Sequence, residues 1–327
     1  MSKLKILITG SDGLVASRVI EIWQADNKLT SPTKLKSNKN SKKFILLTPS
    51  LKTFNLLDLN QITKYLSDQN PDIIIHFAAY TDVTTAEQQT GDVNGLCWQI
   101  NVQGTKNLLT AIEKTPKNTP NLIHISTDMV FPGSLKIPGP YTEVSPLPQN
   151  HKQLTWYGWT KLQAEKLVAD KQGTIIRIIY PVRTHHPKLD FLRKPLELYK
   201  QGQLYPLFND QTISITYIDH LADVLIQILN QPEFTNQTIR KAPRIYHVSS
   251  RNTGTIYDFM TYILNKLGHD SSNLKTSSII AYLKTQPNPN RFPIKGGLDT
   301  TRTEKSLGMK FPTWQEIIDS LIKQGLK

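Results

Sequence analysis

The segment TWYGWTKLQAEK, residues 155–166, places Tyr157 four residues before Lys161. Side chains four apart in a helix lie on the same face, so the lysine ammonium is expected to lie close to the tyrosine phenol. A phenol ordinarily has a pKa of about 10. A neighbouring cation favours the phenolate form, so it lowers this pKa toward the pH at which the group would transfer a proton. The pair can therefore be a proton-transfer device or an ordinary pair on a helix surface.

Two hydroxyl side chains stand where a parallel strand is expected to end. The segment NLIHIST, residues 121–127, is largely apolar and closes with Ser126 and Thr127. The carboxyl ends of parallel strands face the crevice in which such sheets bind ligands. Thr127 is therefore a candidate donor to the carbonyl oxygen that Tyr157 would protonate, with a strand-end cap as the alternative.

A short glycine-containing turn, GSDGLVA, follows the first apolar run of the chain. Gly10 and Gly13 precede a helix-like segment, LVASRVIEIWQ, and Ala16 stands where a third glycine is often found. A strand, a tight turn and a helix in this order direct backbone N–H groups at the pyrophosphate of a dinucleotide. We expect dinucleotide binding here, against the alternative of a plain turn.

The end of the second expected strand, residues 44–48, bears on the choice of cofactor. An acidic residue at that point would bind the adenosine 2′-hydroxyl of NAD, but the chain reads LLTPSLK and offers no carboxylate. Thr48, Ser50 and Lys52 can instead accommodate a 2′-phosphate. NADP(H) is therefore favoured over NAD(H), unless these residues only form a turn.

Apolar runs alternate with helix-like segments before residue 181. Runs at 44–48, 72–79, 121–127 and 174–180 are apolar almost throughout, as buried parallel strands are. This alternation predicts an α/β fold with a doubly wound parallel sheet of the Rossmann type.

The pattern changes after Tyr180, where proline becomes more frequent and the alternation less regular. We expect residues 1–180 to form a dinucleotide-binding domain and residues 181–327 to form a second, smaller mixed α/β domain for substrate. Later segments, about 210–250, are expected to return in part to the first sheet.

Charge and composition narrow the class of partner. The 327 residues include 39 Lys and Arg against 26 Asp and Glu, a formal charge of +13, which suits an anionic small molecule. The densest lysine cluster, residues 34–43, lies in a Ser/Asn-rich segment without aromatic residues to stack on bases, so no nucleic acid is expected. No residues cluster as a metal site would, so no metal is expected.

Cysteine content and hydropathy indicate the compartment. Cys97, the single cysteine, is expected to be a small buried thiol, which fits a reducing environment. No apolar run has the length of a signal peptide or of a bilayer-spanning helix. We therefore expect a cytoplasmic protein with no membrane partner.

Several motifs together resemble the extended short-chain dehydrogenase/reductases: TGSDGLVA at 9–16, HFAA at 76–79, INVQGTKNLL at 100–109, STDMVF at 126–131 and YGWTK at 157–161. Within that superfamily, HFAAYTDVTTAE, STDMVFPG, the DQ of FNDQTISIT and RFPIKGGLDT are similar to segments of the dTDP-4-dehydrorhamnose reductases and their sugar-nucleotide relatives. The resemblance covers nearly the whole chain.

The resemblance implies that NADPH delivers a hydride to the 4-keto carbon of a nucleotide-diphospho-deoxysugar, as in dTDP-rhamnose biosynthesis. It implies that Tyr157 is the general acid, that Lys161 holds the nicotinamide ribose and tunes the phenol, and that Thr127 orients the keto oxygen. The implied cofactor-binding residues are Gly10, Ser11, Asp12, Gly13, Leu14, Val15, Asp58, Leu59, Ala78, Ala79, Tyr80, Asn101, Tyr157 and Lys161. The implied substrate-binding residues are Val83, Thr127, Asp128 and Tyr157, and a homodimer is compatible with the resemblance.

Some of these residues have other readings that stay open. Asp58 can be an N-cap of the next helix, and Asn101 can be an ordinary residue at a helix start. Arg183 and Lys194 are candidates for substrate phosphate, or solvated cations. The pair His185–His186 is expected to be solvated.

The chain also departs from the family pattern. Thr84 replaces an acidic residue, Ile215 replaces a proline between Ser214 and Thr216, and HKQLTW, residues 151–156, is inserted just before Tyr157. These changes put the identity of the substrate in doubt. Two alternatives remain: a sugar-nucleotide epimerase or dehydratase that retains its cofactor, and a non-catalytic regulatory protein that binds the cofactor.

Overall fold

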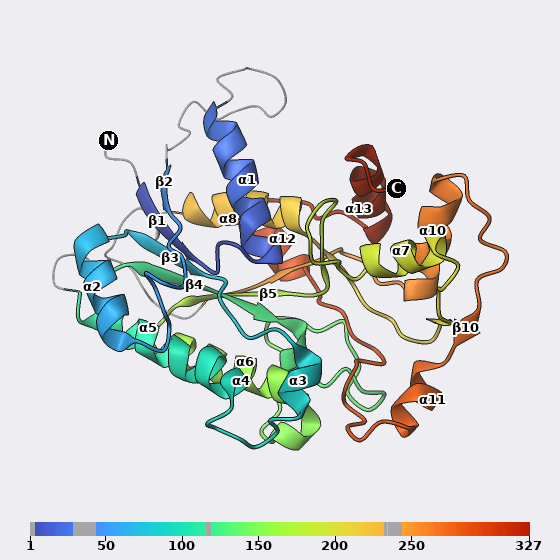
Figure 1. Ribbon diagram of the computed structural model, residues 1–327, viewed down its shortest axis with the longest axis horizontal. Coiled ribbons are helices and arrows are strands. Elements are labelled where there is room, and N and C mark those ends of the chain that lie inside the picture. Colours follow the sequence, from blue (N-terminus) through green and yellow to red (C-terminus); the bar gives the residue numbers. More distant parts are fainter. Residues whose placement is uncertain (1–3, 29–43, 116–118, 232–233, 235–243) are drawn as a thin grey trace. The chain divides into compact units, whose positions relative to one another are not determined.

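A six-stranded sheet carries most of the apolar runs of the chain. In the computed structural model, which describes residues 4–28, 44–115, 119–231, 234 and 244–327, the strand order is β2-β1-β3-β4-β5-β9 (Figure 1). The strands are β1 (Leu4–Thr9), β2 (Phe44–Leu47), β3 (Ile73–His76), β4 (Asn121–Thr127), β5 (Thr174–Ile178) and β9 (Arg244–Val248). The lysine cluster at 34–43 lies outside the described residues.

The strand order reverses beside β1. This strand pairs in parallel with β2 on one side and with β3 on the other, and β3 pairs in parallel with β4. The chain therefore leaves β1 toward one edge of the sheet and returns past it to form β3. Open α/β sheets bind ligands at such a reversal, beyond the carboxyl ends of the strands. The predicted doubly wound parallel α/β fold is confirmed, and the glycine turn after β1 lies at the reversal.

Helices cover both faces of the first four strands. The helix α1 lies on one face and α2 and α5 lie on the other (Figure 1), as right-handed crossovers require when the chain changes direction in the sheet. The helical elements between β1 and β5 are α1 (Leu14–Lys28), α2 (Leu59–Gln69), α3 (Val83–Glu87), α4 (Leu96–Trp98), the π-helical turn η1 (Gln99–Gln103), α5 (Gly104–Glu113), η2 (Asp128–Val130), η3 (His151–Gln153) and α6 (Trp156–Asp170).

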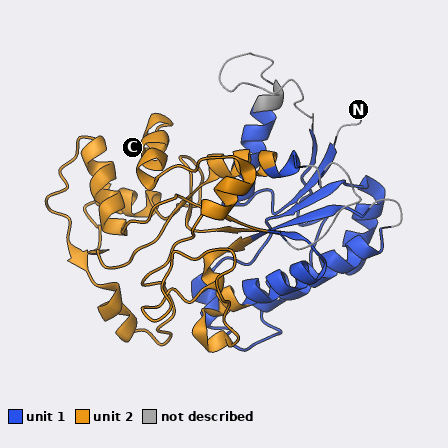
Figure 2. Cartoon of the chain, turned by 180° about the vertical axis from the view of Figure 1, so that it is seen from behind, with its two compact units in different colours: residues 1–125, 160–175, 228–244 blue, residues 126–159, 176–227, 245–327 orange. Residues whose placement is uncertain are grey.

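The chain divides into two compact units (Figure 2). Unit 1 comprises residues 1–125, 160–175 and 228–244, and unit 2 comprises residues 126–159, 176–227 and 245–327. The elements that follow β5, apart from β9, are β6 (Pro181–Val182), α7 (Arg193–Lys200), β7 (Leu207–Phe208), β8 (Thr216–Tyr217), α8 (Ile218–Leu229), α10 (Ile256–Lys266), β10 (Thr276–Ser277), α11 (Ile279–Lys284), α12 (Thr301–Leu307) and α13 (Trp314–Lys323). Within unit 2, β6 pairs with β8 and β7 with β10.

The central strands β1 and β3 are largely buried because both of their faces are apolar, whereas the edge strand β2 is partly exposed. Ile6, Leu7 and Ile8 of β1 and residues 73–75 of β3 have no exposed surface. Cys97 is a buried free thiol, as expected. Among the described helices, none combines the length and the hydropathy needed to cross a membrane.

Candidate active site

The turn after β1 is shaped by the close approach of another strand end. Gly10 has a φ of 65°, and a Cβ at this position would lie 2.8 Å from the backbone nitrogen and Cα of Ala78. The turn is closed by a hydrogen bond from the Gly13 N–H to the Gly10 carbonyl, at 3.0 Å, and α1 begins at Leu14. Two predicted cofactor-binding segments, 10–15 and 78–80, thus meet in unit 1.

Asn101 connects a second pair of predicted residues. It lies inside η1, and its Oδ1 accepts a hydrogen bond from the Tyr80 N–H at 2.8 Å. Its Nδ2 donates to the Tyr80 carbonyl at 3.2 Å and to Oγ1 of Thr160 at 2.9 Å. Because Thr160 directly precedes Lys161, the buried amide of Asn101 ties the start of the lysine segment of α6 to the chain that follows β3.

Lys161 is buried, and among the described residues no carboxylate is in hydrogen-bond contact with it. Its Nζ donates to the Ile125 carbonyl at 2.8 Å and lies 3.1 Å from Nε2 of His124. Burial lowers the pKa of Lys161 to about 8, against the opposing charges of Glu165 and Cys97. The ammonium is therefore still the main form at neutral pH, but only by a small margin.

In unit 2, Thr127 ends β4 and its hydroxyl is held locally. It donates to Oδ1 of Asp128 at 3.1 Å and accepts from the Met129 N–H at 3.2 Å. Burial raises the pKa of Asp128 to about 7, although the hydrogen bond from Thr127 opposes this shift. When Asp128 carries a proton it can donate to Thr127, which releases the threonine hydroxyl proton for another acceptor.

Tyr157 lies in the first turn of α6, which begins at Trp156, and it is 9% exposed. Oγ1 of Thr155 accepts the Gly158 N–H at 3.0 Å, and the Thr155 carbonyl accepts the Trp159 N–H at 2.9 Å, so Thr155 caps the helix. A Cβ on Gly158 would collide with the carbonyl oxygen of Met129. The glycine thus lets the tyrosine end of α6 approach the turn that follows Thr127 within unit 2.

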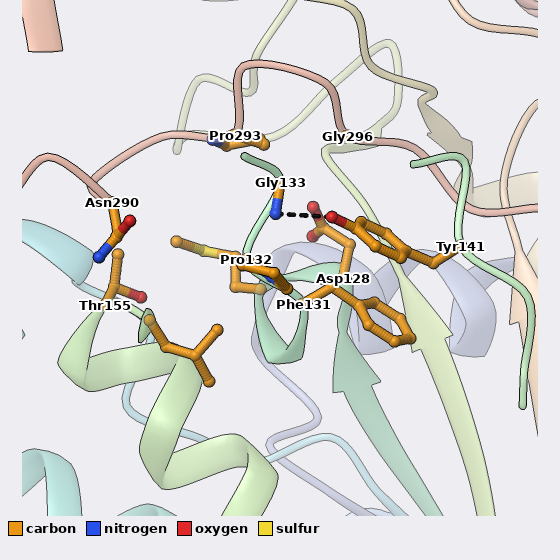
Figure 3. Close-up of a pocket in the computed structure, with 11 residues that line it drawn as sticks. Asp128, Phe131, Pro132, Gly133, Tyr141, Thr155, Asn290, Pro293 and Gly296 are labelled. Carbon is orange, nitrogen blue, oxygen red and sulfur yellow. Dashed lines mark hydrogen bonds between the residues drawn. The ribbon is translucent and has the colours of Figure 1, made fainter. Parts of the chain in front are cut away.

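A pocket of unit 2 lies beside Asp128 (Figure 3). Its lining residues are Asp128, Met129, Phe131, Pro132, Gly133, Tyr141, Leu154, Thr155, Asn290, Pro293 and Gly296. Oη of Tyr141 accepts the Gly133 N–H at 2.8 Å and donates to the Ile137 carbonyl, and its ring stacks on Phe131 with centroids 4.3 Å apart. Burial raises the pKa of Tyr141 to about 12, so this phenol stays neutral.

The insertion at 151–156 forms part of this pocket. Its first residues make the turn η3, whose N-cap is Asn150, and Leu154 and Thr155 line the pocket. The Asn290 side chain donates to the Lys152 carbonyl at 2.8 Å, which ties the insertion to the segment at 290–296. The insertion therefore contributes Leu154 and Thr155 to the pocket wall, and Thr155 lies beside Asn290 (Figure 3).

The other candidate residues singled out from the sequence do not line the pocket beside Asp128. Asp58 caps α2 by accepting the Gln61 N–H at 2.9 Å, and Val83 is the first residue of α3. The Ile215 N–H donates to Oγ of Ser250 at 3.1 Å, a bond that the proline of the family pattern cannot make. The two candidates for substrate phosphate, Arg183 and Lys194, and the pair His185–His186 also lie outside the pocket of Figure 3. Arg183 is buried and its backbone N–H donates to Asp190. Lys194 and His185 are exposed, and His186 is partly exposed.

Four residues described above have no role in the sequence predictions: His124 in unit 1, and Tyr141, Thr155 and Gly158 in unit 2. Thr155 carries the one local signal, since threonine just before a helical pattern is typical of an N-cap. His124 and Gly158 contact residues that are distant in the sequence, Lys161 and Met129. The Tyr141 side chain contacts residues only 4 to 8 positions away, Gly133 and Ile137, through hydrogen bonds that have no sequence signature. In the part of the chain that the structure describes, no group of three or more His, Cys, Asp or Glu side chains could hold a metal ion.

Residues 4–326 match the family model of the RmlD substrate binding domain. The chain is 28% identical over 277 residues to the spore coat polysaccharide biosynthesis protein SpsK of Bacillus subtilis, with 84% of this chain and 83% of the relative covered. It is 23% identical over 321 residues to a dTDP-4-dehydrorhamnose reductase of Aggregatibacter actinomycetemcomitans, covering 97% and 98%. The crystal structure of dTDP-4-dehydrorhamnose reductase from Bacillus anthracis in complex with NADP aligns with a TM-score of 0.76 at 21% identity, covering 99% of this chain and 100% of the other.

Proposed function

The chain belongs to the RmlD substrate binding domain family, and from this premise we propose that it is an NADPH-dependent reductase of the 4-keto group of a nucleotide-diphospho-deoxysugar. Its similarity to reductases of dTDP-4-dehydrorhamnose supports the substrate class. The observation that carries the proposal is Tyr157 placed four residues before a buried lysine, in a helix whose first turn lies against the turn after Thr127.

A nicotinamide cofactor fits the turn after β1. Gly10 has no Cβ, so the backbone of Ala78 packs directly against the turn. The turn at 10–13 leads into α1, and the N-terminus of a helix at such a turn can bind a pyrophosphate. When bound, the cofactor supplies the hydride. Lys161 holds the nicotinamide ribose through the N–H that is left after its contacts with Ile125 and His124.

Two side chains act on the keto oxygen, and a third acts on one of them. Tyr157 donates its phenolic proton to that oxygen as negative charge develops there, and the Lys161 ammonium stabilises the phenolate that results. Thr127 donates a hydrogen bond to the same oxygen. The Thr127 hydroxyl otherwise donates its hydrogen bond to Asp128. Its donation to the keto oxygen is therefore favoured when Asp128 is protonated.

The preference for NADPH rests on the residues that follow β2. Thr48, Ser50 and Lys52 are exposed, and the segment 48–53 carries no carboxylate that would repel a 2′-phosphate. The NADP in the aligned Bacillus anthracis reductase supports the same preference.

The reaction is tested by following the absorbance of NADPH with dTDP-4-keto-6-deoxy-L-mannose, and with related keto sugars, as substrates. We expect stoichiometric oxidation of NADPH, and slower oxidation of NADH. Conversion of a sugar nucleotide without net consumption of free NADPH would instead identify an epimerase or dehydratase. Absence of oxidation with every keto sugar would reject a reductase.

Replacing Gly158 by alanine is expected to lower kcat about ten-fold, because the added methyl group pushes the first turn of α6 away from Met129 and displaces Tyr157. NADPH affinity should change little, since the cofactor turn lies at residues 10–13. Steady-state kinetics and a fluorescence titration with NADPH measure the two effects.

The matched control is Lys166→Ala, which changes an exposed position of the same helix and should leave kcat as it is. A Gly158→Ala protein with the kcat of the wild type would show that the close approach to Met129 does not position the tyrosine.

A further inference from the structure

The surroundings of the Lys161 ammonium in unit 1 include a side chain that the proposed reaction does not use. Nζ contacts the Ile125 carbonyl oxygen at 2.8 Å and Nε2 of His124 at 3.1 Å. Both Lys161 and His124 are buried. These are the two acceptors that the ammonium has in the described part of the chain, so one of its three N–H groups remains for a ligand.

The contact with Lys161 defines the protonation of the His124 ring. An ammonium has donors only, so Nε2 of His124 must accept, and the proton of the neutral ring must be on Nδ1. Burial, reinforced by the charge of Lys161, holds the pKa of His124 well below its usual range, so the ring stays neutral. Nδ1 has no hydrogen-bond partner among the described residues. The ring is therefore held through the one nitrogen that faces the lysine.

A second buried histidine, His76, lies next to this ring, with centroids 5.3 Å apart, but belongs to a different network. The Thr105 hydroxyl donates to the Asn101 carbonyl at 2.7 Å, so Nε2 of His76, at 3.4 Å from the same hydroxyl, is the donor there. Nδ1 of His76 then accepts from the Thr9 hydroxyl at 2.8 Å. Both nitrogens of His76 are therefore committed to threonines.

No direct hydrogen bond joins the two rings in the described part of the chain. Nδ1 of His124 lacks a partner in the described chain, and His76 turns its own nitrogens to Thr9 and Thr105. The one hydrogen bond of the His124 ring within the described chain is the one that it accepts from Lys161.

Nε2 of His124 is one of two acceptors that favour the charged form of Lys161, so its loss is expected to lower the pKa of the lysine. Glu165 of the same helix and Cys97 of α4 favour the ammonium, whereas burial opposes it. His124 of β4 and His76 of β3 face it as neutral rings, since burial and the charge of Lys161 lower the pKa of both, that of His76 to about 3. Removing the acceptor is therefore expected to favour the neutral amine.

We propose that His124 is a positioning residue for Lys161: its neutral Nε2 accepts one N–H of the ammonium and, together with the Ile125 carbonyl, sets the direction of the N–H that remains for the cofactor. This inference rests on the proposed function, in which Lys161 binds the nicotinamide ribose. His124 touches neither cofactor nor substrate and acts through the lysine.

A spectroscopic experiment tests the contact without turnover. In protein labelled with ¹⁵N at histidine, with the His124 signals assigned from their loss in His124→Leu, we expect the Nδ1–H tautomer at neutral pH and a change in the Nε2 signal as Lys161 titrates at about pH 8. Lys161→Met should abolish that change. His76 is the internal control, because its ring should show the opposite tautomer. An Nε2–H tautomer of His124 at neutral pH, or an unchanged titration in Lys161→Met, would overturn the proposal.

Kinetics test the consequence for the reaction. His124→Leu is expected to lower kcat about ten-fold with an unchanged KM for the keto sugar, and to move the alkaline limb of the pH–rate profile about one unit lower, because a bond that favours the ammonium is lost. His124→Gln supplies an amide oxygen as an acceptor in place of Nε2. This variant should recover most of the lost kcat and most of the shift of the alkaline limb. His76→Leu removes an equally buried ring and should leave the alkaline limb in place.

A His124→Leu protein with the alkaline limb of the wild type, or a glutamine variant without any rescue, would refute the role. If no keto sugar is reduced at all, the proposed function fails. In that case the tautomer of His124 and its response to Lys161→Met still decide whether this ring holds the ammonium.

Discussion

Replacing Tyr157 by phenylalanine is expected to lower kcat for keto-sugar reduction about a thousand-fold, within the range typical of a lost general acid. Phenylalanine keeps the ring that is packed at the start of α6 and removes only the hydroxyl. NADPH should therefore still bind with nearly unchanged affinity. Single-turnover kinetics with saturating NADPH, together with a fluorescence titration, measure the two quantities.

The control for this change is Tyr282→Phe, which removes a phenolic hydroxyl from the partly exposed helix α11 and should leave kcat unchanged. A Tyr157→Phe protein with full activity would rule out the tyrosine as the acid. If the cellular role also persisted in a strain that carries only this variant, the regulatory alternative would be favoured over catalysis.

Replacing Lys161 by methionine is expected to abolish measurable reduction and yet to raise the free energy of unfolding at pH 7 by roughly 1–3 kcal/mol. Burial lowers the pKa of Lys161 from 10.5 to about 8. That difference corresponds to a penalty of roughly 3 kcal/mol for the buried charge. Methionine removes the charge at similar length. It also leaves the Ile125 carbonyl and Nε2 of His124 without their donor, which offsets part of the gain. Urea unfolding at pH 7 measures the difference.

The gain in stability should shrink as the pH rises. Below about pH 8 the folded and unfolded wild-type chains both hold the proton of Lys161. The folded wild type then bears the full cost of burying the charged ammonium. Between about pH 8 and pH 10.5 the folded protein releases that proton while the unfolded chain retains it, and this favours the folded wild type. Lys166→Met, on the exposed face of α6, should show neither effect. A Lys161→Met protein that is less stable than the wild type at pH 7 would mean that the acceptors around Nζ outweigh the cost of burial.

Much of the fold follows from patterns that are local in the sequence. Buried parallel strands are apolar on both faces, which is why the runs that contain 6–8 and 73–75 can be recognised without a structure. The turn at Gly10 and the pair Tyr157–Lys161 are also readable, because their chemistry depends on short spacings. The division of the chain near residue 180 and the assignment of individual cofactor contacts stay predictions.

Contacts between distant segments could not be read in the same way. Gly158 owes its role to the carbonyl of Met129, and His124 owes its role to a lysine on another element. A histidine inside an apolar strand and a glycine inside a helix have no spacing that reveals these partners. Burial likewise decides that the Asp128 carboxyl has a pKa of about 7, and burial depends on the whole surrounding fold.

The helix that carries Tyr157 contains its own starting signal, since Thr155 caps it from the last part of the insertion. The cap fixes where the helix begins, whatever precedes it in the chain. Under the proposed function, residues 151–154 could therefore vary with the sugar while Tyr157 keeps its place. Such a division would allow new substrate preferences to evolve without rebuilding the catalytic helix.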